Sequence, residues 1–499
     1  MTYIAEALAF LLQPSIFIMA VLGAMAGLVL GAIPGLSGGM AIMICLPLTF
    51  SMDPMVAIVL LMSIYIGGIS GGYIGSILLG IPGTVNSIAT VYDGYEFTKQ
   101  GHPARALSAA AVANFLGTVP SLIVAMFASQ VIARWAVKLG PAEYFSLCFF
   151  AIILVISLSK DDMAKGLFAM ALGFALKMIG IAPISATKRF TFGNVNLQGG
   201  FGIACVMMGL FGGTLVLLEY AKESRTNGSF SEVKVEGFHL PLSDFTGNIV
   251  NIIRSYCIGL LVGFMPGMGG TIANVAAYSI AKNSSKHPEK FGTGIIDGVW
   301  APEVANNASI GGAVIPMIAL GIPGDSTTAL LLSAMTIQGL TVGPLLFTTQ
   351  TKFVYLIFLG GVLAATGCLI FQILGMRLFP ALFKIPYHYL YPIILVCSFI
   401  GIYSANYSFF ELACSLIFIL MGVLLRMFGV GTGPFILTFV LSTMLEQNFR
   451  NAVCYADNGY MTFITSPVAC LLLLGSAALI LWPIIKSLTG LGKAGEKEK

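Results

Sequence analysis

Charge is scarce in this chain. Only 9% of its 499 residues are Asp, Glu, Lys or Arg, whereas a typical soluble domain has roughly 25%. The 25 basic and 21 acidic residues give a net charge of +4, and 57% of the residues are hydrophobic. A soluble fold cannot cover that much apolar surface with so few charges. The composition therefore excludes a soluble enzyme, a disordered chain and a nucleic-acid-binding protein, and it indicates a polytopic protein of the lipid bilayer.

Motifs that would indicate an enzyme are also missing. The nine cysteines form no Cys-x-x-Cys pair, and the four histidines form no His-Glu-x-x-His motif. The sequence has no nucleotide-binding loop and no recognisable catalytic triad. We therefore expect neither catalysis nor a cofactor. Because no Lys or Arg precedes Lys99, the N-terminus lacks the basic region of a signal peptide, and the first apolar segment is expected to act as its own insertion signal.

Apolar segments take up most of the chain instead. Ten are at or near the length that a bilayer requires: residues 16–33, 104–130, 143–159, 164–182, 201–220, 248–264, 353–375, 390–402, 407–428 and 463–486. Four more are apolar but interrupted by Gly, Pro, Ser, Thr or Asn: residues 34–52, 68–92, 264–281 and 310–337. We predict an all-α polytopic membrane protein with about 10–14 membrane segments, including interrupted helices or re-entrant hairpins.

The two halves of the chain resemble each other. The segment around Pro34-Gly35 is similar to that around Pro266-Gly267, 232 residues later, and Gly-Ile-Pro-Gly at 80–83 recurs at 321–324, 241 residues later. Two ordered matches inside interrupted segments indicate an internal duplication. We predict an N-terminal membrane repeat at 1–225, a polar connecting segment at 226–247, a C-terminal membrane repeat at 248–487 and a polar tail at 488–499.

Basic residues indicate how the repeats are oriented. The loop after the first Gly-Ile-Pro-Gly carries Lys99 and Arg105, whereas the matching stretch at 336–344 has no charge. Conversely, the loop at 282–290 carries three lysines, and its counterpart around Asp53 has no basic residue. Since basic loops stay in the cytoplasm, equivalent loops would lie on opposite faces of the membrane. The pattern predicts two inverted repeats, with both basic loops in the cytoplasm.

The paired helix breaks are the candidate site. A break exposes N–H groups that attract anions and carbonyl groups that bind cations, and short polar side chains follow each one. Substrate binding is predicted for Pro34, Gly35, Ser37, Pro82, Gly83, Thr84, Asn86, Ser87, Pro266, Gly267, Asn274, Pro323, Gly324, Ser326 and Thr327. Na⁺ ligands are predicted at Asn86, Asn306, Asn307 and Ser326. The alternative is that the Pro-Gly turns only shape helix packing.

Three further groups have two interpretations. Glu303, Asn306 and Asn307 either coordinate a substrate or cation, or belong to an interfacial loop between helix ends. Asp325 would repel an anion, so we expect it to cap its half-helix or to face a cation. Glu446 and Arg450 are predicted to form an ion pair at the end of a span.

Longer motifs resemble a known family, the large membrane subunit (TctA family) of tripartite tricarboxylate transporters. They are Pro34-Gly-Leu36, Ile81-Pro-Gly83 to Thr90, Asp93-Gly-Tyr95, Gly101, Ala106-Leu107, Asp161-Asp162, Lys165-Gly166, Arg189-Phe-Thr-Phe-Gly193, Phe291-Gly-Thr-Gly294, Ala301-Pro-Glu303, Ala305-Asn-Asn-Ala308, Leu320-Gly-Ile-Pro-Gly324 and Glu446-Gln-Asn-Phe-Arg450. The sequence departs from the family pattern at Ser37-Gly38, Ala182, Ala281 and the turn around Asp457, which bears on the substrate more than on the class.

The resemblance implies a secondary transporter subunit of the bacterial cytoplasmic (inner) membrane. It implies import of carboxylates, such as citrate, other di- and tricarboxylates or aromatic acids, in symport with Na⁺ or H⁺. It also implies two partners, a small four-span membrane subunit and a periplasmic solute-binding protein. The alternative function is an uncoupled carboxylate channel or permease.

Overall fold

The computed structural model describes residues 2–34, 36, 38–49, 52–158, 163–214, 216–218, 234–340, 342–383, 392, 395–396, 398–403, 407–455 and 459–488. These residues are mostly helical. The strands described are β1 (Gly180–Ile181) and β2 (Lys188–Arg189), which pair antiparallel with Gly180 opposite Arg189. The all-α class is therefore confirmed. The predicted site residues Gly35 and Ser37, and part of the predicted span 390–402, lie outside the described residues.

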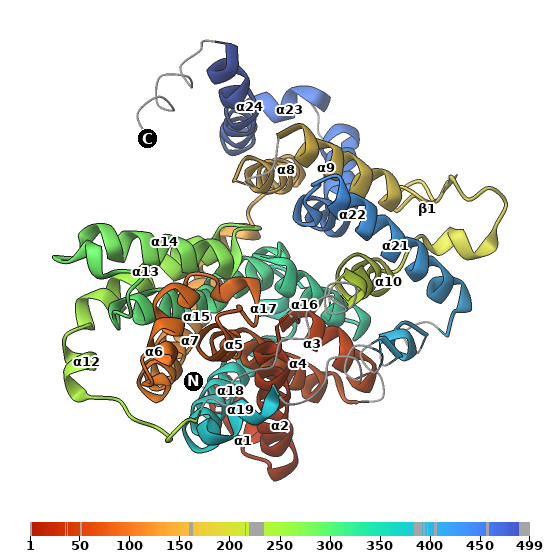
Figure 1. Ribbon diagram of the computed structural model, residues 1–499. Helices are drawn as coiled ribbons and strands as arrows, with labels where there is room; N and C mark the ends of the chain where they lie inside the picture. Colours follow the sequence, from red (N-terminus) through yellow and green to blue (C-terminus); the bar gives the residue numbers. More distant parts are fainter. Residues whose placement is uncertain are drawn as a thin grey trace. The chain divides into compact units, whose positions relative to one another are not determined.

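The chain divides into two compact units (Figure 1). Unit 1 comprises Met1–Arg134 and Ile203–Val423, and unit 2 comprises Trp135–Gly202 and Leu424–Lys499. This division follows spatial contacts, whereas the predicted domain boundaries followed the sequence duplication. Those boundaries stay a prediction.

Unit 1 holds all four Pro-Gly breaks. Its α-helices are α1 (Thr2–Leu11), α2 (Pro14–Ala32), α3 (Gly38–Cys45), α4 (Pro54–Ser70), α5 (Gly72–Leu79), α6 (Thr90–Lys99), α7 (Pro103–Ala136), α10 (Ile203–Met207), α12 (Leu242–Thr246), α13 (Ile249–Phe264), α14 (Gly269–Ser284), α15 (Asp297–Leu320), α16 (Ser326–Ile337), α17 (Leu346–Thr349), α18 (Thr351–Gly375), α19 (Phe379–Leu382) and α21 (Phe409–Met427). Its 3₁₀ turns are η1 (Leu46–Thr49), η2 (Val85–Ser87), η5 (Pro288–Lys290) and η6 (Met376–Leu378), and η4 (Met208–Gly213) is a π-helix.

Unit 2 is built mainly from four helices: α8 (Pro141–Leu158), α9 (Met163–Lys177), α22 (Thr432–Tyr455) and α24 (Pro467–Leu488). The shorter elements are η3 (Val195–Gly199), η7 (Gly459–Met461) and α23 (Thr462–Thr465). The predicted ion pair is confirmed: Arg450 lies 2.9 Å from the Glu446 carboxylate, which Arg189 also contacts at 2.6 Å. The sequence did not predict a helical segment at α22, because polar residues interrupt its apolar residues.

Five stretches of the described residues are long and apolar enough to cross a membrane: Pro14–Ala32, Pro54–Leu79, Pro103–Ala136, Thr351–Leu382 and Phe409–Met427. A sixth would combine Gly459–Thr465 with Pro467–Leu481, which meet at a bend of 82°. Several of the other predicted spans are shorter apolar helices, such as α8, α13 and α16. The predicted total of 10–14 membrane segments counts such helices and stays a prediction.

One expectation about local structure is wrong. The interpretation of Glu303, Asn306 and Asn307 as an interfacial loop fails, since all three lie within the continuous helix α15 and are fully buried. Pro302 and Pro316 stand inside the same helix. Buried prolines are tolerated at membrane depth because neighbouring groups can satisfy the backbone that they free. The actual interruption comes later, between Leu320 and Ser326.

The packing of α2 on α4 recurs in the packing of α13 on α15. A side chain on Gly31 would lie 2.1 Å from the carbonyl oxygen of Gly68. A side chain on Gly263 would lie 2.4 Å from that of Ser309. Gly263 follows Gly31 by 232 residues and Ser309 follows Gly68 by 241, which are the offsets of the sequence matches. Only glycine lets the two backbones touch at these points.

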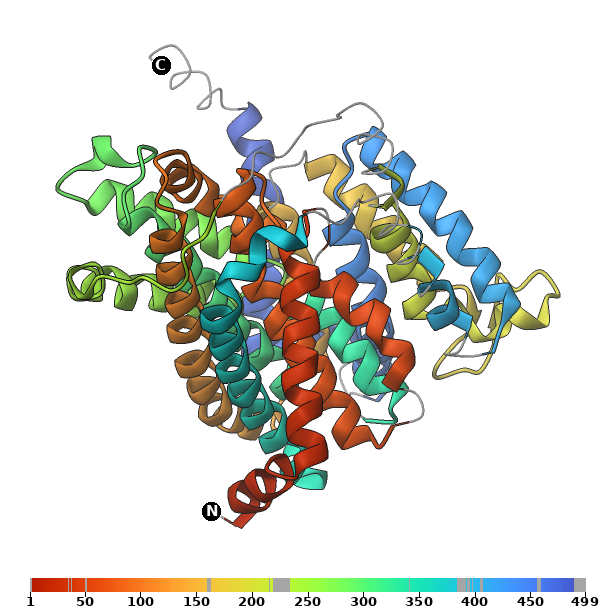
Figure 2. The same ribbon diagram turned by 60° about the horizontal axis from the view of Figure 1, so that its bottom comes forward.

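Two long helices, α7 in the first half of unit 1 and α18 in the second, pack on each other in opposite directions. Ser108 near the start of α7 contacts Met376 just beyond α18, at 3.7 Å, and Gln130 near the end of α7 donates to Tyr355 near the start of α18. Gly117 of α7 packs against α15, whereas Gly361 of α18 packs against α4. Helix α7 of the first half thus packs on the second half of unit 1, and α18 of the second half packs on the first. In both views α18 lies beside α1 and α2 (Figure 2).

Candidate functional site

Both Gly-Ile-Pro-Gly segments form the same turn. Gly80 ends α5 with φ 69°, and Gly321 ends α15 with φ 73°. This left-handed conformation suits glycine and strains other residues, and the proline two positions later prevents the helix from resuming. The sequence repetition therefore corresponds to a repeated backbone structure.

The last glycine of each Gly-Ile-Pro-Gly turn packs on the helix before the other Pro-Gly break of the same half. Gly83 packs on α2, and Gly324 packs on α13. A side chain on Gly83 would lie 2.6 Å from the carbonyl oxygen of Gly31, and one on Gly324 would lie 2.9 Å from that of Gly263. In the second half, the backbone N–H of Gly267 also donates to the carbonyl of Gly324 at 2.6 Å. The two kinds of Pro-Gly break are therefore adjacent within each half.

The start of α14, in the second half of unit 1, is hydrogen-bonded to residues that follow the first Gly-Ile-Pro-Gly turn. The Thr271 hydroxyl donates to Asn86 Oδ1 at 2.6 Å, and Asn274 Oδ1 accepts from the backbone N–H of Ala89 at 2.9 Å. Asn274 is fully buried. Two predicted site residues from different halves, Asn86 and Asn274, are thus brought to one helix.

The start of α16 lies on the other side of the α14 start. Asp325 caps α16 by accepting from the backbone N–H of Thr328 at 2.7 Å, and the Thr328 hydroxyl completes a capping box. The expected capping role of Asp325 agrees with this geometry. Tyr65 of α4 donates to the Asp325 carboxylate at 3.4 Å, and a side chain on Gly269 would meet Asp325 at 2.9 Å.

The other predicted residues differ in how exposed they are. Ser326 is exposed, Thr327 is buried, and Pro34 is half-buried at the end of α2. Asn307 is buried with all its amide groups used: Oδ1 accepts from Ser70 and Thr118, and Nδ2 donates to Asn114 and to the carbonyl of Glu303. Asn307 therefore fastens α4, α7 and α15 together.

Other buried polar groups have no hydrogen-bond partner among the described residues. They include Thr84 Oγ1, Ser87 Oγ, Glu303 Oε2 and both amide atoms of Asn306. We call these four residues the central polar cluster. Ser87, Glu303 and Asn306 are 0% exposed and Thr84 is 5% exposed. Buried polar atoms without partners are rare in folded proteins and often mark a place where a ligand or ion binds.

The two basic loops lie together at one end of unit 1. Asp93 Oδ1 accepts from the backbone N–H groups of Gly292, Gly294 and Ile295 at 2.8, 2.9 and 3.0 Å, and Oδ2 accepts from the Tyr278 hydroxyl at 2.8 Å. A side-chain hydrogen bond to Glu96 raises the pKa of Lys99 at this end. We call this arrangement the Asp93 clamp. The sequence contained Asp93 only as part of a family motif and gave no sign of its partners, which are mainly backbone groups.

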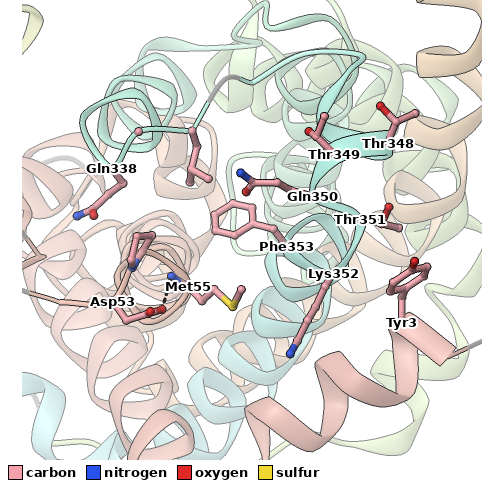
Figure 3. Close-up of a pocket in the computed structure, with 13 residues that line it drawn as sticks. Tyr3, Asp53, Met55, Gln338, Thr348, Thr349, Gln350, Thr351, Lys352 and Phe353 are labelled. Atoms are coloured by element: carbon pink, nitrogen blue, oxygen red, sulfur yellow. Dashed lines mark hydrogen bonds between the residues drawn. The ribbon is translucent and has the colours of Figure 1, made fainter.

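The two loops without basic residues, around Asp53 and at 336–344, lie together elsewhere in unit 1. Gln338 Nε2 donates to the carbonyl of Thr49 at 2.8 Å. A cavity of about 520 Å³ opens beside this contact (Figure 3). Its lining includes Asp53 and Met55 at the start of α4, and Gln350 and Lys352 at the start of α18.

The apolar helices, the buried polar cluster and the paired helix breaks define a multi-pass α-helical membrane protein. The family model described as "Tripartite tricarboxylate transporter TctA family" matches residues 17–437. The chain therefore belongs to the TctA family, as its motifs indicated. It is a subunit of a tripartite transporter, and the family is one of transport proteins and not of enzymes.

Two relatives come from Agrobacterium vitis. One, described as a 52.8 kDa protein in the TAR-I ttuC' 3' region, is 33% identical over 485 residues, which is 95% of this chain and 95% of the relative. The other, described as a protein in the TAR-II ttuC' 3' region, is 37% identical over 229 residues, which is 45% of this chain and 93% of the relative. No solved structure matches the chain.

Proposed function

We propose that this subunit imports di- or tricarboxylates or aromatic acids across the bacterial cytoplasmic membrane in symport with Na⁺ or H⁺. A periplasmic solute-binding protein would deliver the substrate, and a small four-span membrane subunit would complete the complex. The observation that carries the proposal is the position of the α14 start, which contacts Asn86 after the first turn and Asp325 after the second. Such a convergence of helix breaks suits a binding site for an anion and a cation together.

The proposal includes inverted repeats. Three observations support them: the glycine contacts recur at the sequence offsets, α7 and α18 are antiparallel, and each packs on the central helix of the opposite half. α4 and α15 also cross in opposite directions, because Tyr65 reaches Asp325 beyond the end of α15 whereas Ser70 reaches Asn307 in its middle. Equivalent helices that run in opposite directions are expected when one repeat is inverted in the membrane.

The carboxylate would bind at the start of α14. The first N–H groups of a helix lack partners within the helix and carry the positive end of its dipole. At this helix the first residues are Gly269, Gly270 and Thr271, and the two glycines carry no side chain that would keep a carboxylate away from the backbone. Asn86, linked to Thr271, would orient the substrate.

Transport by the reconstituted complex tests the function. We would place the subunit, its small membrane partner and its binding protein in liposomes and supply labelled citrate, other carboxylates and aromatic acids in turn. An imposed Na⁺ or H⁺ gradient should drive accumulation above the external concentration of one class of acid. Equilibration without accumulation would support the uncoupled permease, and no uptake of any acid would refute both.

The site is tested with Asn86→Ala. Loss of a buried hydrogen-bond partner costs about 1–3 kcal/mol, so substrate affinity should fall roughly ten- to a hundredfold. Gln350→Ala, in the cavity lining away from the α14 start, is the matched amide control. Near-wild-type binding of the transported acid by Asn86→Ala would place the site elsewhere.

A further inference from the structure

Glu303 carries a buried carboxyl group without a compensating cationic side chain among the described residues. It is 0% exposed in the middle of α15. Oε1 accepts from the Thr90 hydroxyl at 2.5 Å, whereas Oε2 has no partner. An ionised carboxylate inside a membrane protein is costly unless a positive charge accompanies it. A carboxyl group in this position therefore either holds a proton or accompanies a bound cation.

Neutral oxygen atoms surround this position. The Ser87 hydroxyl faces the Glu303 carboxyl group without completing a hydrogen bond of good geometry. Thr84 Oγ1 and Ser87 Oγ both point at Gly72, where a side chain would lie 2.4 and 2.6 Å from them. Gly72 leaves room for two hydroxyl groups that donate to no described residue.

Asn306 adds an amide oxygen from the same helix. It follows Glu303 by three residues, so the two side chains share one face of α15. Its Oδ1 lies 2.4 Å from the place of a side chain on Gly270, and Asn86 Nδ2 lies 2.9 Å from the same place. Asn306 therefore extends the central polar cluster from Glu303 toward the start of α14, where the substrate is proposed to bind.

We propose that the central polar cluster is the binding site of the coupling Na⁺, with Glu303 as its charged ligand. The inference rests on the proposed symport function and adds Glu303 to the ligands predicted from sequence. A proton on Oε2 could be donated to Ser87 Oγ, but it would leave Thr84 Oγ1 and the Asn306 amide oxygen without partners. A hard cation takes several oxygen ligands at once.

The single charge selects the type of cation. Among the described residues, no three His, Cys, Asp or Glu side chains gather at a metal site. One carboxylate with neutral oxygens balances a monovalent ion, whereas sites for divalent ions collect more negative charge. Na⁺ bound at Glu303 would also lie next to the α14 start and attract the anionic substrate there.

Binding of radiolabelled Na⁺ to the purified full-length protein in lipid nanodiscs tests the site without any substrate. The wild-type protein should bind Na⁺ in a choline background. Glu303→Gln keeps the shape and removes the charge, and it should weaken Na⁺ binding about ten- to a hundredfold. Glu236→Gln makes the same chemical change at an exposed position of unit 1 and should bind as the wild type does.

A second variant covers the case in which Glu303→Gln does not fold. Ser87→Ala removes one neutral oxygen and should weaken Na⁺ binding about tenfold, with size-exclusion elution unchanged. Wild-type Na⁺ affinity in the folded Glu303→Gln protein, or in Ser87→Ala if only that variant folds, would overturn the proposal, as would absence of Na⁺ binding to the wild type.

The outcome is separate from that of the transport function. Proton-driven carboxylate accumulation with no Na⁺ binding would leave the function in place and refute this site. Na⁺ binding that depends on Glu303 in a protein that transports no carboxylate would support the site and refute the proposed substrate.

Discussion

The Asp93 clamp and the Gln338 contact occupy corresponding places in the two halves of unit 1. Helix α6 is followed by Gln100 and by Gly101 with φ 81°, and α16 is followed by Gln338 and by Gly339 with φ 79°. Each glutamine donates its side-chain N–H to a backbone carbonyl in a loop of the other half, Gln100 to Thr293 and Gln338 to Thr49. The duplication thus extends to single hydrogen bonds.

The surroundings of the two glutamine contacts differ. Beside the Gln100–Thr293 contact, Asp93 adds four hydrogen bonds. Beside the Gln338–Thr49 contact, the corresponding part of α16 around Leu332 is apolar, and a cavity of about 520 Å³ opens. A duplicated architecture can therefore be closed firmly at one end and weakly at the other. If the proposed transport opens unit 1 at each end in turn, the Asp93 end must break more hydrogen bonds than the Gln338 end.

The largest effect expected concerns membrane sidedness, which is all or none. In a cysteine-free background, His102→Cys and Lys286→Cys should react only with a reagent on the cytoplasmic side, since both flank the Asp93 clamp and carry the basic excess. Thr349→Cys, in the cavity lining, should react only from the opposite side. All three positions are exposed. Labelling of His102→Cys and Lys286→Cys from different sides would break the comparison.

Next in size is the removal of the clamp by Asp93→Ala. Three backbone N–H groups and the Tyr278 hydroxyl would lose their acceptor, and each unsatisfied group costs about 1–3 kcal/mol. Hydrogen exchange at residues 292–295 should accelerate by roughly a hundredfold or more. Exchange at Thr49–Met52 in the same sample is the internal control and should not change. Unaltered exchange at 292–295 would show that the clamp does not hold the loop.

Tyr278→Phe should have a smaller effect at the same place. It removes one hydrogen bond to Asp93 Oδ2 and leaves the three backbone contacts to Oδ1. A single hydrogen bond to a charged group contributes about 1.5–3 kcal/mol. Exchange at 292–295 should therefore accelerate less than in Asp93→Ala, and an equal effect would mean that the tyrosine alone positions the carboxylate.

The smallest effects should come from the two glutamines. Gln100→Ala and Gln338→Ala each remove one neutral hydrogen bond, which contributes about 0.5–1.5 kcal/mol. Gln338→Ala should increase exchange around Thr49 more than Gln100→Ala increases it around Thr293. The reason is that the Asp93 clamp supports the Gln100–Thr293 contact but not the Gln338–Thr49 contact. The reverse order would contradict the view that the Gln338 end is the weaker one.

Sequence patterns predicted the helices and the breaks better than the contacts. Apolar runs located α2, α7, α13 and α18, because bilayer length and hydrophobicity determine such helices locally. The repeated Gly-Ile-Pro-Gly located two turns with nearly equal glycine φ values. The position of Asn86 beside Thr271, 185 residues apart, depends on tertiary packing, which no local pattern specifies.

The errors and omissions have the same origin. Polar residues suggested a loop at Glu303 and Asn306, although α15 is continuous there, because their cost is met by the interior of unit 1 and not by water. The partners of Asp93 are backbone N–H groups, which any residue carries. Ser326 and Asn307 were indistinguishable from Asn306 in the sequence, yet one is exposed, one is fully bonded and one has no partner.

The packing of α18, from the second half of unit 1, on helices of the first half has a consequence for biosynthesis. Gln372 of α18 donates to the carbonyl of Ser70, which precedes it by 302 residues. At about 5–20 residues per second, the ribosome needs roughly 15–60 s to deliver that partner. During this interval α4 is in the membrane without the helix that finally covers it. We therefore expect the nascent first half to require shielding by the insertion machinery, and a chain that stops before α18 to be degraded rather than to persist as a folded half.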